Sequence, residues 1–163
     1  MSKIIILLLT TTTILLANDL KIEKKSINTK KEVLKKKELK KVSDIEKSSF
    51  KSEHFDSVVT IKKVINLNKE DDITLDITPK GEWHINKGFP IKFKLKSDCK
   101  SDKKKYKKKD LKSITEKDLS VDMKLKCEKK GNQTVIVTGA FGVCSKDMCK
   151  RETIKLKVKT EVK

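Results

Sequence analysis

The segment Ile73-Thr74-Leu75-Asp76-Ile77 decides the fold class, because apolar and polar residues alternate strictly along it. Successive side chains of a β-strand point to opposite faces of a sheet, so this alternation predicts a strand with one buried and one solvated face. The same period continues from Ser57 to the C-terminus, which makes residues 57–163 a predicted β-domain. Its other apolar positions are Val59, Ile61, Trp83, Ile85, Ile91, Phe93, Leu95, Val121, Met123, Leu125, Val135, Val137, Phe141, Val143, Ile154, Leu156 and Val158.

Turn sequences separate these predicted strands. Gly and Pro mark the turns Pro79-Lys80-Gly81, Lys87-Gly88-Phe89-Pro90 and Lys130-Gly131-Asn132. About seven or eight short strands joined by such turns are typical of an antiparallel β-sandwich, which is the fold that we predict. Lysines alternate with the apolar residues, so much of the charge is expected on the solvated faces of the strands.

The chain is strongly basic, with 41 Lys and Arg residues against 23 Asp and Glu residues and a net charge of +18. Nearly all of the cations are lysines, and aromatic residues make up only 4% of the chain. Nucleic-acid recognition usually relies on the fork of Arg and on aromatic stacking, so the composition argues against a nucleic-acid partner. An anionic surface or an acidic protein stays open as a partner, beside a plain solvated surface.

Residues 1–17 are predicted to be a secretory signal peptide. Lys3 supplies the positive start, an apolar run extends over residues 4–16, and Ala17 precedes a cleavage point at Asn18. The alternative is an uncleaved anchor, but the run is shorter than the roughly 20 residues that a spanning helix needs. The mature chain is therefore expected in the periplasm or outside the cell, in an oxidising compartment.

Residues 18–56 differ in composition from the β-domain and are predicted to be a Lys-rich arm, partly helical or disordered. Thr29 and Glu32 fit a capping box, and apolar residues at helical spacing follow, so a helix over residues 30–47 is proposed. Such a helix could dock on a partner, or the arm could be a solvated linker. His54 has no companion ligand in the sequence and is interpreted as a surface residue.

An insertion at residues 100–112 interrupts the alternation and is predicted to be a loop or a frayed edge. It contains a basic run that could attract an anionic partner, or could simply be solvated. The candidate binding residues are Lys103, Lys104, Lys105, Tyr106, Lys107, Lys108 and Lys109.

Four cysteines lie in the β-domain, and an even number in an exported chain predicts disulfides with three possible pairings. Cys99 and Cys127 each continue the inward-facing apolar series of a predicted strand. This parity favours a Cys99–Cys127 bridge and leaves Cys144 with Cys149. A zinc site that uses the four cysteines and His84 lacks the usual paired spacing, so we expect no metal and no cofactor.

The two predicted bridges close loops of different length. Closing about 29 residues stabilises the fold by roughly 3.6 kcal/mol, whereas closing about 6 residues stabilises it by roughly 2.2 kcal/mol. The Cys99–Cys127 bridge is therefore interpreted as structural. The Cys144–Cys149 bridge either staples a hairpin or forms a reducible pair in an exposed turn.

Two segments resemble a known family. Gly81-Glu82-Trp83-His84-Ile85-Asn86 followed by Phe89-Pro90, and the stretch from Val135 to Cys149, are similar to segments of exported immunoglobulin-like domains. Over residues 57–160 the chain resembles the N-terminal periplasmic domain of DsbD-type thiol:disulfide interchange proteins. The resemblance implies an immunoglobulin-like sandwich in which Cys144 and Cys149 are a catalytic redox pair that exchanges electrons with thiol proteins of the cell envelope.

Two functional hypotheses follow. The first is a non-enzymatic exported adaptor, in which a disulfide-stapled sandwich presents the arm or the basic run to a protein partner or an anionic surface of the envelope. The second is a periplasmic thiol:disulfide exchange module that cycles the Cys144/Cys149 pair. Fold alone does not decide between these functions.

Overall fold

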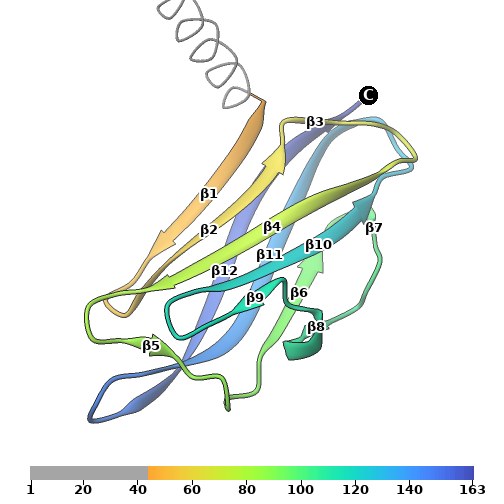
Figure 1. The fold of residues 1–163 in the computed structure, drawn as a ribbon. Coiled ribbons are helices and arrows are strands. Elements are labelled where there is room, and N and C mark those ends of the chain that lie inside the picture. The colour runs from red at the N-terminus through yellow and green to blue at the C-terminus, as the bar shows by residue number, and fades with distance from the viewer. Residues whose placement is uncertain (1–43) are drawn as a thin grey trace, which may run out of the picture. The chain divides into compact units, whose positions relative to one another are not determined.

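A computed structural model of the protein describes residues 44–163, which form an all-β fold of two sheets (Figure 1). The predicted signal peptide and residues 18–43 of the predicted arm lie outside the described residues. In chain order the elements are β1 (Ile45–Lys51), β2 (Phe55–Lys62), β3 (Val64–Ile65), β4 (Glu70–Pro79), β5 (His84–Ile85), β6 (Lys92–Lys96), β7 (Lys100–Ser101), β8 (Tyr106–Lys107), the 3-10 turn η1 (Lys108–Asp110), β9 (Ser113–Ile114), β10 (Leu119–Lys126), β11 (Gly131–Cys144) and β12 (Cys149–Val162).

The two sheets divide the strands between them. The first sheet has the order β1-β2-β4-β10-β7, with β9 also paired to β10. The second has the order β3-β12-β11-β6-β8, with β5 also paired to β11. Strand pairs are antiparallel except β12 with β3. The predicted antiparallel β-sandwich is therefore confirmed, and the long β11–β12 hairpin forms the centre of the second sheet.

The alternating apolar residues fill the space between the sheets. In β2 and β10 every second residue is buried, as the period of two predicts. Aromatic rings from both sheets meet there: the centroids of Phe55 and Phe141 lie 4.9 Å apart in an edge-on arrangement. Phe93 packs closely against β11 because position 139 is Gly, where a Cβ atom would lie 2.1 Å from its ring. The core thus fixes β11 against both β6 and the facing sheet.

The sandwich begins earlier than residue 57. Strand β1 pairs with β2 from Ile45 opposite Lys62 to Lys51 opposite Asp56. Residues 45–47 are thus a strand, and the proposed helix over residues 30–47 is wrong at this end. Most side chains of β1 are exposed, so no apolar alternation identifies it; its backbone hydrogen bonds to β2 stabilise it instead.

The insertion at residues 100–112 is more ordered than predicted. It contributes β7, β8 and η1, and Tyr106 of β8 is buried in the core. The Tyr106 hydroxyl lies 2.9 Å from the Ser101 hydroxyl and donates to the Asp102 carboxylate. Because burial and the bond to Asp102 disfavour the phenolate, the pKa of Tyr106 rises to about 12. This tyrosine anchors the basic run to the sandwich.

Candidate redox site at the end of the β11–β12 hairpin

The structure contains two disulfides, Cys99–Cys127 and Cys144–Cys149, which are the pairings that strand parity favours. The Cys99–Cys127 bridge joins the end of β10 to the segment after β6. Cys127 is fully buried and Cys99 packs against the core, so this bridge lies at the edge of the core. All four cysteines are disulfide-bonded. Over residues 44–163, no cluster of three or more His, Cys, Asp or Glu side chains could hold a metal ion.

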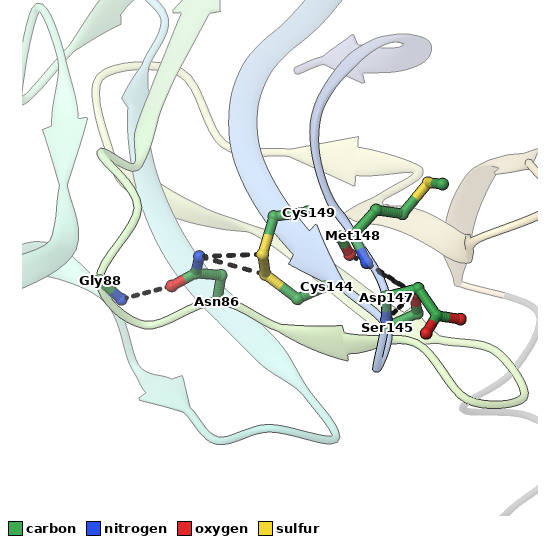
Figure 2. The surroundings of a disulfide bond; sticks show 7 residues. All are labelled: Asn86, Gly88, Cys144, Ser145, Asp147, Met148 and Cys149. Carbon is green, nitrogen blue, oxygen red and sulfur yellow. Dashed lines mark hydrogen bonds between the residues drawn. A yellow bond between two sulfur atoms is a disulfide. The ribbon is translucent and has the colours of Figure 1, made fainter.

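The Cys144–Cys149 bridge closes the last residue pair of the β11–β12 ladder. The two Cα atoms lie 4.0 Å apart, and four residues form the turn between them. The backbone N–H of Ser145 donates to the carbonyl of Met148 over 2.8 Å. The Ser145 hydroxyl accepts weaker hydrogen bonds from the backbone N–H groups of Asp147 and Met148 (Figure 2). These hydrogen bonds within the turn stabilise its conformation.

The two cysteines differ in exposure. Cys144 is 6% exposed, whereas Cys149 is an exposed residue. Met148, directly before Cys149, is also exposed at the tip of the hairpin. A second thiol can therefore approach the bridge from the Cys149 side.

The side-chain amide of Asn86 faces the disulfide (Figure 2). Its Nδ2 lies 3.2 Å from Sγ of Cys144 and 3.9 Å from Sγ of Cys149. Its Oδ1 accepts a hydrogen bond from the backbone N–H of Gly88, which directs the NH₂ group toward the sulfurs. The Asn86 backbone N–H donates to the carbonyl of Gly142, so the whole residue is fixed to β11.

The segment that carries Asn86 covers the inner cysteine. Strand β5 pairs His84 opposite Cys144, and Phe89 folds back over Gly142. A Cβ atom at position 142 would lie 2.5 Å from Cγ of Phe89, so only Gly allows this contact. The segment that resembles the exported family therefore lies directly against the disulfide.

A cluster beside the hairpin corrects the interpretation of His54. Its side chain is only 15% exposed, and Nδ1 lies 2.6 Å from Oε1 of Glu152. Its ring centroid is 4.2 Å from that of Trp83. Lys150 lies over the same Trp83 ring and places Nζ 3.3 Å from Nε2 of His54. His54 is thus a partly buried residue that links β12 to the segment before β2.

Sequence reasoning missed both Asn86 and the His54 cluster. Their partners lie 58 and 98 residues away along the chain, and no local pattern reports such a contact. The family resemblance includes Asn86 in its segment, and this was the only sequence feature that drew attention to the residue.

The basic run contributes lysines to the surface but not its tyrosine. Tyr106 is buried, which contradicts its assignment as a binding residue, because its ring completes the core beside Phe93. Lys103 forms an ion pair of 2.7 Å with Asp110, and Lys108 donates to the carbonyl of Lys87. Lys104 and Lys105 are exposed.

Comparisons of the chain with protein-family models, with curated proteins and with solved structures found no match. Within residues 44–163, no helix is long and apolar enough to cross a membrane. The class that the fold defines is an all-β, disulfide-bonded sandwich, and this class does not by itself determine a function.

Proposed function

We propose that this protein is an exported thiol–disulfide exchange module whose working pair is Cys144 and Cys149. The observation that carries the proposal is the asymmetry of the pair: Cys149 is exposed, while Cys144 is covered and lies 3.2 Å from the Asn86 amide. An exchange disulfide needs one accessible sulfur and one leaving group whose thiolate is stabilised.

The exchange begins at Cys149. An incoming thiolate attacks Sγ of Cys149, the disulfide bond breaks, and Cys144 leaves as a thiolate. Nδ2–H of Asn86 donates to that thiolate, a charge-assisted bond that is stronger than the bond to the neutral disulfide. The second thiolate of the partner then attacks the partner's sulfur in the mixed disulfide. This step forms a disulfide within the partner and releases Cys149 as a thiolate. In total the partner dithiol loses two electrons and two protons, and the Cys144–Cys149 pair gains them.

Charges around the hairpin also favour thiolates. Lys146, Lys150 and Arg151 lie next to the pair in sequence, and Asp147 is the nearby opposing charge. Lys150 is held over Trp83, which places its ammonium group 5.4 Å from the ring centroid beside the end of the hairpin.

The compartment agrees with this chemistry. Two disulfides indicate an oxidising, extracytoplasmic environment. Together with the predicted signal peptide at residues 1–17, they support a periplasmic or secreted protein. The DsbD-type resemblance supports a thiol protein of the cell envelope as the exchange partner.

A glutathione exchange experiment tests the proposal. The native full chain would be incubated with reduced and oxidised glutathione, trapped by acid, and mapped by alkylation and mass spectrometry. We expect glutathione on Cys149 and an unchanged Cys99–Cys127 bridge. Exchange at both bridges with equal rates, or mixed disulfide mainly on Cys144, would contradict the proposal.

The second candidate is a non-enzymatic adaptor, and the edge strand β1 favours it. Strand β1 ends the first sheet, and Phe50 on it is 43% exposed. The end strand of a sheet can pair with a strand of another chain. A Cys144→Ala/Cys149→Ala variant separates the two functions, because an adaptor would still capture its partner and an exchange module would lose its activity.

A further inference from the structure

The outer face of the second sheet carries two rows of lysines. Strand β11 lies between β6 and β12 (Figure 1). The pairing places Lys94 and Lys155 on either side of Thr138, and Lys96 and Lys157 on either side of Ile136. Neighbouring strands are about 4.8 Å apart, so the two rows are separated by roughly 10 Å.

The rows continue toward the disulfide end of the sheet. Lys92 lies beside Ala140, and Lys107 of β8 pairs directly opposite Lys92. Arg151 follows opposite Gly142, where β11 approaches the hairpin end. We name these seven cations the basic face: Lys92, Lys94, Lys96, Lys107, Arg151, Lys155 and Lys157.

No acidic side chain of the described residues neutralises the charges of the basic face. Within residues 44–163, none of its seven cations forms an ion pair. Like charges directly opposite each other, such as Lys92 and Lys107, destabilise a sheet. Lys105, Lys94, Arg151 and Lys107 lower the pKa of Lys92 by their repulsion, which reflects this crowding.

The outer face of the first sheet shows the opposite arrangement. There Lys124 pairs with Glu70 at 3.4 Å, and Lys112 pairs with Asp122 at 3.2 Å. Asp122 also accepts a hydrogen bond of 2.8 Å from Thr74. A Lys-rich composition therefore does not by itself produce an unpaired face, because the same chain balances the charges on its other sheet.

The middle of the basic face is uncharged and hollowed. The half-buried side chains of Thr138 and Ala140 form its floor, and Lys92, Lys94 and Thr153 line the sides. Large exposed apolar residues in the described chain lie elsewhere, at Ile45, Phe50, Val64 and Met148. A trough whose apolar side chains are at least half-buried, with no stacking ring among its lining residues, is poorly suited to insertion into a bilayer or to stacking of bases.

We infer that the basic face binds an extended acidic segment of a partner protein, laid along β11 between the two lysine rows. Lysines two residues apart on β6 or β12 are roughly 6.6 Å apart, which is also the spacing of alternate side chains in an extended peptide. An acidic run would thus direct its odd side chains to one row and its even side chains to the other. Carboxylates there would relieve the repulsion that the fold leaves in place.

A matched pair of full-chain variants tests this inference, with a fluorescent octaglutamate peptide as the probe. The first variant is Lys92→Gln/Lys94→Gln/Lys155→Gln on the basic face. The control is Lys117→Gln/Lys126→Gln/Lys130→Gln, which removes the same charge from exposed positions elsewhere. We expect roughly tenfold weaker peptide binding in the first variant, since each exposed ion pair contributes modestly, and little change in the control.

Carbodiimide coupling maps the peptide in the same experiment, because it joins carboxylates to the lysines that they contact. Couplings concentrated on Lys94 and Lys155 would support the inference. Equal loss of peptide binding in both variants would show that only the net charge of the protein matters, and it would overturn the inference. The same variants would be tested for binding to phosphatidylserine vesicles and to a single-stranded oligonucleotide. If loss of the face lysines weakened either of these more than it weakened peptide binding, the inference would also be overturned.

Discussion

Nδ2 of Asn86 lies 3.2 Å from Sγ of Cys144, although 58 residues separate the two in the chain. The amide is fixed by its bond to the Gly88 N–H, so it meets the sulfur without a change of rotamer. This contact would act mainly on the reduced pair, because a thiolate is a stronger acceptor than a disulfide sulfur.

Replacement of Asn86 by Ala tests the role of that contact. Loss of a hydrogen bond to a charged group costs about 1.5 kcal/mol or more, which destabilises the reduced form. We therefore expect the reduction potential of the Cys144–Cys149 pair to fall by roughly 30 mV. Asn132→Ala, at an exposed position at the start of β11, is the matched control. An unchanged potential in Asn86→Ala would show that the amide only packs against the bridge.

Gly142 is expected to be intolerant of even one methyl group. Gly142→Ala must displace the Phe89 ring, which lies 2.5 Å from the added atom, and overpacking of this kind costs roughly 1–3 kcal/mol. Gly88→Ala is the control, since its added atom would meet only the Asn86 side chain, at 3.3 Å. Denaturant unfolding measures both. The larger loss of unfolding free energy should fall on Gly142→Ala.

Tyr106 makes stability depend on alkaline pH. Its pKa is about 12 in the folded protein against an ordinary value of 10.0, so the neutral form stabilises the fold fully below pH 10. That stabilisation is lost as the pH rises from 10 to 12, by roughly 2 kcal/mol. The tyrosine is the only one in the chain, so tyrosinate absorbance reports it directly.

The control for this titration is Tyr106→Phe, in which the tyrosinate signal disappears. The free energy of unfolding of the wild type should approach that of this variant as the pH rises from 10 to 12. A tyrosinate midpoint near pH 10 in the folded chain would contradict the buried hydroxyl and its bond to Asp102.

The domain boundary has a direct test by truncation. Removal of residues 18–56 would delete β1 together with Phe55, a fully buried residue at the start of β2. Loss of a buried Phe alone costs about 3–5 kcal/mol, so this chain should fail to fold. A chain that lacks residues 18–43 keeps both β1 and Phe55 and should therefore be the more stable of the two truncations. Equal stability of both truncations would mean that β1 contributes nothing.

The sequence predicts the fold well where side chains alternate. Ile73, Leu75 and Ile77 are buried at every second position, and the same alternation in the other predicted strands, with turn sequences between them, identifies the sandwich. Strand β1 could not be found in this way, because its pairing uses backbone groups and leaves its side chains largely exposed. The burial of Tyr106 could not be predicted for a related reason, because a single buried residue between lysines produces no hydrophobic periodicity.

The site was predicted only in part. The bridge between Cys144 and Cys149 is the pair that remains once strand parity, a local property of the sequence, favours Cys99–Cys127. The contacts of Asn86 with the sulfurs and of His54 with Glu152 depend on how distant segments fold together. Two neighbouring lysine rows likewise require the strand order, since β6 and β12 are far apart in the chain but flank β11.

The reduction potential of the Cys144–Cys149 pair decides whether this bridge exchanges electrons or only staples the hairpin. It would be measured in the native chain, with both disulfides followed separately by alkylation and mass spectrometry. Exchange proteins have potentials between roughly −270 and −120 mV, whereas structural disulfides lie below about −300 mV. We predict a value in the exchange range for Cys144–Cys149 and a value below about −300 mV for Cys99–Cys127. A potential below about −300 mV for both bridges would contradict it and leave a sandwich whose hairpin is merely stapled.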